Sequence, residues 1–175
     1  MGYELPAAIG VYHATQRSVL CIAGDGSIMM NLQELAYIGG LSLPIKLVLL
    51  NNKGYHSIRQ TQKNYFPDNP VGCGVESGLP FPDFSQLASG FGISYMKLEK
   101  EPDMDSHIRR FLDHEGPILM EVLLDQEQEF APKLASKKLA NGSMITAELE
   151  DMTPLLGDSV MRQIRRKAME VEYLK

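Results

Sequence analysis

Four short apolar segments, separated by stretches with a helical pattern, constrain the fold of this chain more than any other feature. Each segment has the length of one buried strand, and they cover residues 18–23, 45–50, 94–98 and 118–124. Helical patterns lie between them, at residues 31–39, 55–63, 83–91 and 102–115. Strands joined by such helices pair in parallel through right-handed crossovers. The pattern therefore predicts an α/β fold, an open parallel sheet with helices on both faces.

Local signals indicate where some of these elements begin and end. Asn31 is predicted to cap the helix that follows it, and Gly39-Gly40 to end that helix. A loop rich in proline and glycine covers residues 66–82, and Asp83 then opens the next helix. These signals place a long irregular connection between the second and third strands.

The pattern changes after Asp125. We therefore predict one domain at residues 1–125 and a C-terminal extension at residues 126–175. Residues 126–156 show no clear period, and we interpret them as an ordered segment that wraps the domain or a neighbouring subunit. Residues 157–173 carry an apolar stripe at helical spacing. A terminal helix with such a stripe needs a surface to pack on, which favours a homo-oligomer.

Composition restricts the class of protein. With 175 residues, 44% hydrophobic and 22% charged, the chain matches one ordinary globular domain. The net charge of −5 disfavours nucleic acid as a partner, because phosphate binding needs a basic surface. No run of 18 apolar residues is present, and the first residues lack signal-peptide character. We expect no membrane association and a cytoplasmic location.

The two cysteines fit a reducing compartment. They lie 52 positions apart and form neither a disulfide framework nor a zinc pattern. Cys21 falls in the first strand, where it is expected to be a small buried side chain. Cys73 falls in the long loop, where its thiol could be exposed.

Polar residues follow the first two predicted strands at the point where each strand ends. One strand ends in Gly24-Asp25-Gly26-Ser27 and the next in Asn51-Asn52-Lys53-Gly54. Ligands gather at the carboxyl ends of parallel strands, so Asp25 and Asn52 can reach the same point if the two strands pair. Carboxylate, amide and carbonyl oxygens suit Mg²⁺ or Ca²⁺. Taken singly, each segment could be an ordinary turn, but the two together favour a cation and phosphate site.

These segments resemble the thiamine diphosphate-dependent enzyme family, and in particular its acetolactate synthase-like members. The motif G-D-G-S at residues 24–27, followed by N-N-K-G at 51–54, is similar to the family's cofactor-binding motif. The first ten residues resemble the family's M-G-x-x-L-P-A-A-I-G stretch, and residues 31–35 resemble its N-x-Q-E-L. The likeness covers residues 1 to about 125 and indicates the C-terminal, pyrophosphate-binding domain.

The resemblance implies a ligand set for the metal. Asp25 and Asn52 match the two side-chain ligands, and the carbonyl of Gly54 matches the third protein ligand. The expected cofactors are thiamine diphosphate and Mg²⁺, or Ca²⁺ in its place.

The resemblance also implies contacts to the organic cofactor. Gly24, Gly26 and Ser27 match the loop that holds the diphosphate. Met1 matches the apolar residue that wedges beneath the bent cofactor, and Gly2 belongs to the same segment.

Residues that could face the substrate follow the predicted metal loop. Tyr55 is a candidate cofactor contact. His56 is the candidate catalytic residue, although a histidine here could instead only cap or pack the next helix.

The implied activity is decarboxylation and carboligation of 2-oxo acids. In the family a glutamate on a separate domain sets the cofactor's tautomer, and no stretch of this chain resembles that domain. We therefore expect the C-terminal third of a larger enzyme, or one subunit of a split enzyme, that is inactive alone. Its partners would be the missing N-terminal domains or a partner subunit, a 2-oxo acid and further copies of itself. FAD is possible in the full-length enzyme.

Other readings stay open at this point. The metal loop also resembles that of some 2-oxo acid decarboxylases. A non-catalytic binding or assembly module of the same fold would keep the same motifs. An unrelated nucleotide-binding protein is disfavoured, because neither G-x-G-x-x-G nor G-x-x-x-x-G-K-[ST] follows a predicted strand.

Overall fold

The chain divides into two compact units, Met1–Gln128 and Glu129–Lys175. The computed structural model describes residues 1–66, 68–99, 102, 104–128, 130–134, 136–138, 141–146, 149, 152 and 157–172.

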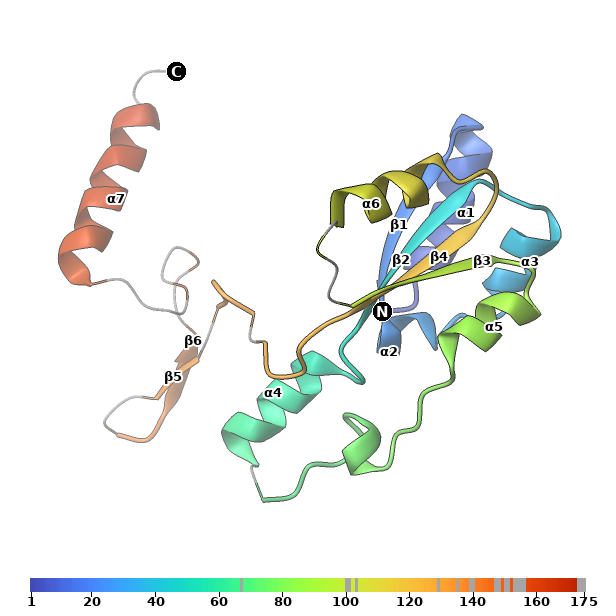
Figure 1. Cartoon of the computed structure of the whole chain (residues 1–175). Coiled ribbons are helices and arrows are strands. Elements are labelled where there is room, and N and C mark those ends of the chain that lie inside the picture. The colour runs from blue at the N-terminus through green and yellow to red at the C-terminus, as the bar shows by residue number, and fades with distance from the viewer. Residues whose placement is uncertain are drawn as a thin grey trace. The chain divides into compact units, whose positions relative to one another are not determined.

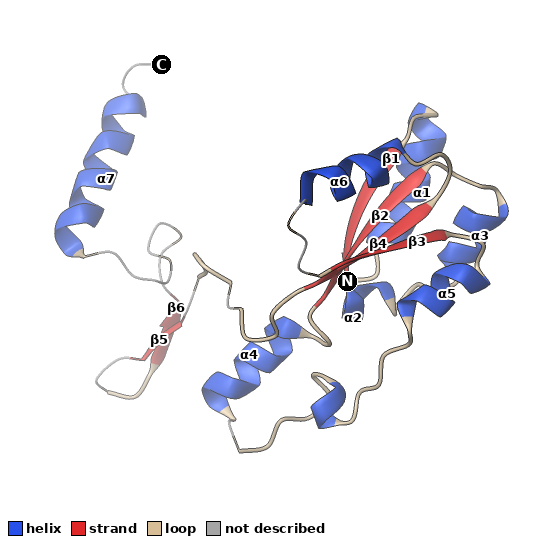
Figure 2. Cartoon of the chain, in the orientation of Figure 1, coloured by secondary structure: helices blue, strands red, loops and turns tan. Residues whose placement is uncertain are grey.

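A four-stranded parallel sheet forms the centre of the first unit (Figures 1 and 2). Its strands are β1 (Val19–Gly24), β2 (Ile45–Asn51), β3 (Ser94–Leu98) and β4 (Ile118–Leu123). Their order in the sheet is β1-β2-β4-β3, and every pairing is parallel. Because the strands are parallel, all four carboxyl ends lie at one edge, where Gly24 pairs with Leu50 and Leu50 with Val122. The predicted α/β fold with an open parallel sheet is confirmed.

In the described part of the first unit, helices and one 3₁₀ turn lie before and between these strands. They are α1 (Glu4–Thr15), α2 (Asp25–Ile28), α3 (Glu34–Gly40), α4 (His56–Tyr65), η1 (Val75–Ser77), α5 (Phe84–Gly90) and α6 (Met104–Asp113). The predicted helices are present, and α6 begins at Met104 rather than at Pro102. Asp83 was predicted to open this helix, and in the structure it is the N-cap of α5, since its carboxylate accepts from the N–H groups of Ser85 and Gln86.

The two faces of the sheet are buried against different helices. On one face Leu47, Leu49 and Leu119 pack with residues of α1, α3 and α5 to form the larger core. On the other face Ile118 and Met120 pack with Phe111 of α6. Adjacent residues of a strand point to opposite faces, which explains how Leu119 and Met120 enter different cores. Figure 1 shows α6 on the near side of the sheet and α1 behind it.

The edge strand β1 is only partly covered. Cys21 and Ala23 are buried in the larger core, and the prediction of a buried Cys21 is confirmed. The alternate residues Leu20 and Ile22 are 54% and 60% exposed. The second face of the sheet is therefore open at β1, although an evenly covered sheet was expected.

The predicted capping role of Asn31 is wrong. Helix α3 begins three residues later, at Glu34, and no side chain caps it. The Asn31 amide instead donates to the Gly2 carbonyl, which binds the N-terminal segment to the connection between α2 and α3. The Asn31 side chain thus binds a residue distant in the sequence and does not cap the helix that follows it.

The second unit contains a short hairpin and a terminal helix. β5 (Ser136–Lys138) and β6 (Met144–Thr146) pair antiparallel, and the sequence analysis did not predict them. Helix α7 (Asp158–Glu172) confirms the predicted terminal helix, apart from Tyr173, which lies outside the described residues. Met161 is buried, whereas Val160 and Ile164 of the predicted stripe are 43% and 42% exposed.

Among the described residues, the helices are all too short or too polar to cross a lipid bilayer.

A pair of glycine substitutions tests the packing of α3 on the segment after α5. A Cβ at Gly39 would lie 1.8 Å from the Phe91 carbonyl oxygen, so Gly39→Ala should destabilise the chain by about 2 kcal/mol or more. Gly10 lies inside α1 with open space around it, so Gly10→Ala should stabilise the chain by about 0.5–1 kcal/mol. Urea unfolding measures both changes, and equal effects would contradict the packing described.

Candidate functional site

The carboxyl ends of β1 and β2 meet where the sequence analysis placed the site. Asp25 directly follows β1, and the loop at residues 51–54 follows β2, with Gly24 paired to Leu50. The Gly54 N–H donates to Asp25 Oδ2 at 2.8 Å, and the Gly26 N–H donates to Oδ1 at 2.8 Å. One carboxylate therefore connects the two loops directly.

Asp25 is a deeply buried carboxylate. The residue is only 2% exposed. Burial raises the pKa of Asp25, while the hydrogen bonds from the Gly54 and Gly26 N–H groups and the charge of Arg59 act in the opposite direction. The site thus holds a carboxylate that a nearby cation would stabilise.

Asn52 presents a buried acceptor in the loop whose Gly54 N–H binds Asp25. Its Oδ1 atom is shielded from solvent, and no donor among the described residues reaches it. A buried acceptor without a partner is costly, so this atom needs a donor or a cation. Its backbone carbonyl, by contrast, accepts from the Arg59 guanidinium at 3.3 Å.

The donor set fits a hard divalent cation. Asp25 supplies carboxylate oxygens, Asn52 an amide oxygen, and Gly54 a backbone carbonyl, which are the ligand types of Mg²⁺ and Ca²⁺. No cluster of three or more His, Cys, Asp or Glu side chains suited to a metal occurs in the described part of the chain. A cation at this site would therefore depend on amide and carbonyl oxygens.

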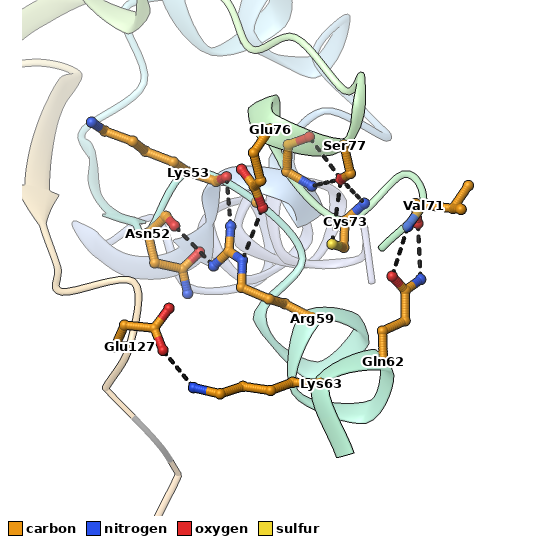
Figure 3. A network of polar contacts seen from close by, with 12 residues as sticks. Asn52, Lys53, Arg59, Gln62, Lys63, Val71, Cys73, Glu76, Ser77 and Glu127 are labelled. Carbon is orange, nitrogen blue, oxygen red and sulfur yellow. Dashed lines mark hydrogen bonds and ion pairs between the residues drawn. The ribbon is translucent and has the colours of Figure 1, made fainter. Parts of the chain in front are cut away.

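Arg59 of α4 holds the backbone of the loop that carries Asn52 (Figure 3). Its guanidinium donates to the carbonyls of Asn52 and Lys53, at 3.3 and 2.9 Å, and forms an ion pair with Glu76 at 3.4 Å. The Arg59 side chain is 13% exposed, while that of Glu76 is 50% exposed. Arg59 thus connects three segments, and sequence reasoning did not single it out.

Residues 71–78 fold back against Gly54. The Tyr55 N–H donates to the Cys73 carbonyl at 2.8 Å, and a Cβ at Gly54 would lie 2.1 Å from that oxygen. Gly54 also has a φ of +151°, which L side chains rarely adopt. Because this segment is packed, Cys73 is fully buried, and the expectation of an exposed thiol is wrong.

The N-terminal segment is attached to the loop after β1. The Gly2 N–H donates to Ser27 Oγ at 2.9 Å, and Gly2 adopts a φ of +75°. Ser27 Oγ accepts this bond and keeps its own proton available to donate. Met1 is 71% exposed beside this segment. The predicted diphosphate loop and the predicted wedge residue are therefore neighbours.

Tyr55 packs against Gly26 across the site. A Cβ at Gly26 would lie 2.5 Å from the ring of Tyr55, so only glycine allows this contact. The same ring lies 6.4 Å from the ring of Phe81. His56 begins α4 and is 8% exposed. The structure thus gathers the predicted site residues at one edge of the sheet.

A cavity of about 420 Å³ lies beside the loop at this edge. Its lining comes from the ends of β2 and β4 and from residues following β3 and β4, and consists of Asn51, Lys53, Glu99, Leu123, Leu124, Asp125 and Gln126. Of the loop residues, Asn51 and Lys53 border this cavity.

The pH dependence of stability tests the environment of Asp25. Because burial raises its pKa, the folded chain binds this proton more tightly than the unfolded chain does. Asp25 then contributes less to the free energy of unfolding as the pH rises above about 4, the ordinary carboxyl value. In EDTA, the stability of the unsubstituted chain relative to Asp25→Ala should fall with rising pH.

Asp83 provides a control of opposite sign for that experiment. The Ser85 hydroxyl and the N–H groups of Gln86 and Ser85 lower the pKa of Asp83. Its contribution is present above the ordinary carboxyl pKa and is lost as the pH falls. Urea unfolding above about pH 4 measures the change due to Asp25, and unfolding below about pH 4 measures the change due to Asp83. The same sign for both would overturn the assignment.

Arg59 and Glu76 can be compared by substitution. Arg59→Met removes hydrogen bonds to two backbone carbonyls and should cost about 2 kcal/mol of stability. Glu76→Gln removes only a half-exposed ion-pair partner and should cost less than about 1 kcal/mol. Urea unfolding of both variants measures the difference, and a larger cost for Glu76→Gln would show that the ion pair dominates.

Comparison with known proteins gives consistent matches over most of the chain. Residues 1–122 match the family model described as the thiamine pyrophosphate enzyme, C-terminal TPP binding domain. The acetolactate synthase large subunit of Pyropia yezoensis is 35% identical over 146 residues, which are 83% of this chain and 24% of that protein. The acetolactate synthase isozyme 1 large subunit of Escherichia coli (strain K12) is 34% identical over 146 residues, 83% of this chain and 25% of that protein.

A third relative extends the match slightly. The acetolactate synthase large subunit of Cyanidium caldarium is 35% identical over 156 residues, 87% of this chain and 26% of that protein. The chain thus spans about a quarter of the length of these relatives. The resemblance predicted from the motifs is confirmed.

Proposed function

Because the chain belongs to the thiamine pyrophosphate enzymes through their C-terminal cofactor-binding domain, we propose that it binds thiamine diphosphate together with Mg²⁺ in an acetolactate synthase-like enzyme. The substrates we propose are 2-oxo acids. Ca²⁺ would satisfy the same oxygen ligands.

One observation carries the metal part of this proposal. The buried Asn52 Oδ1 lacks a partner among the described residues, and the buried Asp25 carboxylate is tied to Gly54 of the same loop. A cation between them would satisfy the amide oxygen and stabilise the carboxylate. Asp25, Asn52 and the Gly54 carbonyl are therefore the ligands we propose.

The loop after β1 would receive the diphosphate. Gly24 has open space where a Cβ would lie, so a phosphate can approach its backbone, and the Ser27 hydroxyl can donate to it. Gly26 belongs to the same segment, and its missing side chain makes room for the Tyr55 ring. Met1 and Gly2 would border the rings of the cofactor, and Tyr55 would border the metal loop. When bound, thiamine diphosphate supplies a thiazolium that accepts the electrons released when a 2-oxo acid loses carbon dioxide.

The active assembly we propose is larger than this chain. A glutamate-bearing domain, from another part of the polypeptide or from a partner subunit, would set the tautomer of the cofactor. Association of several copies, and FAD bound outside this domain, belong to the same proposal. His56 is the residue proposed to face the substrate.

Calorimetric titration of thiamine diphosphate tests the site. Binding should require Mg²⁺ and disappear in EDTA. Asp25→Ala and Asn52→Ala should each weaken it by about tenfold or more, because each removes a ligand. Asp83→Ala is the matched control, since it removes an exposed capping carboxylate of α5 and should leave the affinity unchanged.

Two results would contradict the proposal. Binding that persists in EDTA or in Asp25→Ala would overturn the metal bridge. A folded chain that binds no cofactor with Mg²⁺ even when the glutamate-bearing domain is supplied would favour a non-catalytic module of the same fold.

Product analysis separates carboligation from simple decarboxylation. Supplied with the glutamate-bearing domain and a 2-oxo acid, the carboligase should form a 2-hydroxy-2-alkyl-3-oxo acid, whereas a decarboxylase should release only aldehyde and carbon dioxide. The matches to acetolactate synthases support the first outcome.

A further inference from the structure

Glu121 places a carboxylate inside the apolar strand β4. The residue is 8% exposed, and its neighbours Met120 and Val122 point to the opposite face. A buried carboxylate is costly unless it is fully hydrogen-bonded. The bonds that Glu121 makes therefore indicate what it does.

Its two oxygens accept from the two neighbouring strands. The Tyr95 hydroxyl on β3 donates to Oε2, and the Asn51 amide at the end of β2 donates to Oε1. This is possible because β4 lies between β2 and β3 in the sheet. Burial and the Glu121 carboxylate both raise the pKa of Tyr95, so its hydroxyl stays protonated and able to donate.

Asn51 carries the connection into the candidate metal loop. Its side-chain oxygen accepts from the Lys53 N–H at 2.9 Å, and its backbone carbonyl accepts from the Leu124 N–H at 2.8 Å. Lys53 adopts a φ of +59°, a left-handed conformation that costs energy for a residue other than glycine. The Asn51 side chain thus stabilises the turn that presents Asn52 and Gly54.

We propose that Glu121 is a positioning residue: oriented by Tyr95, it fixes the Asn51 side chain, which holds the turn at residues 51–54 and directs Asn52 and Gly54 towards Asp25. The inference rests on the proposed function only in taking this turn as the cation-binding loop. Glu121, Tyr95 and Asn51 are not themselves proposed ligands; their role is to hold the residues that are.

Amide hydrogen exchange on the full 175-residue chain tests the positioning without any cofactor. The probes are the N–H groups of Lys53 and Gly54, which bind Asn51 Oδ1 and Asp25 Oδ2. In Glu121→Leu both should exchange about tenfold faster or more, because Asn51 loses its acceptor. In Glu121→Gln both should return to within about threefold of the unsubstituted chain, since the glutamine oxygen still accepts from Asn51.

Two further variants complete the design. Lys46→Met is the matched control, because Lys46 is a buried charged residue of β2 that instead binds the carbonyls of His114 and Gly116. It should lower stability without accelerating exchange at Lys53 and Gly54 beyond the other amides. Tyr95→Phe, which removes only the hydroxyl, gives a second test if Glu121→Leu fails to fold, and should accelerate exchange at the same two amides.

Titration of Mg²⁺ at a fixed concentration of thiamine diphosphate separates the two proposals. The inference predicts a rise of about tenfold in the half-saturating Mg²⁺ concentration for Glu121→Leu, restored by Glu121→Gln and absent in Lys46→Met. If the unsubstituted chain, supplied with the glutamate-bearing domain, binds no cofactor while the exchange pattern is as expected, the proposed function fails and the positioning stands. Unchanged exchange at Lys53 and Gly54 in both Glu121→Leu and Tyr95→Phe would overturn the inference.

Discussion

The hydrogen bond from the Gly54 N–H to the buried Asp25 carboxylate is the interaction on which the candidate site depends. It joins Asp25, the first residue of α2 directly after β1, to the loop after β2, and the two residues are 29 positions apart in the chain. It is possible only because β1 and β2 pair in parallel and end at the same edge of the sheet. In the proposed function, a cation at this point would stabilise the buried carboxylate.

The rest of the site keeps this arrangement in place from three directions. Arg59 of α4 binds the carbonyls of Asn52 and Lys53 from one side. Residues 71–78 pack on Gly54, and the Glu121 carboxylate acts through Asn51 from within the sheet. The only buried oxygen in this loop without a partner among the described residues is Asn52 Oδ1. A preorganised ligand site requires this arrangement, in which the supporting groups have their hydrogen-bond partners and one acceptor lacks a partner.

Local sequence patterns predicted the elements that depend on local physics. The strands follow from continuous apolar runs, and the Asp83 cap follows from a side chain that reaches its own helix. The failures have the opposite character. The Asn31 amide binds the Gly2 carbonyl and does not cap α3 as predicted. Cys73 is buried, although it was expected to be exposed, because residues 71–78 fold onto Gly54. In both cases a contact with a residue distant in the sequence outweighed the preference that the local sequence indicated.

The sequence by itself determined the parallel α/β fold, the family, and the two strand-end motifs that carry Asp25 and Asn52, because periodicity and glycine-flanked polar residues are local properties of the chain. Only the tertiary structure decided which groups support those motifs. Arg59 lies on a helix after the loop, and Glu121 and Tyr95 lie on strands reached through long crossovers. The roles of Glu121 and Tyr95 depend on the order of the strands, which places β4 between β2 and β3. No single segment of the sequence specifies that order.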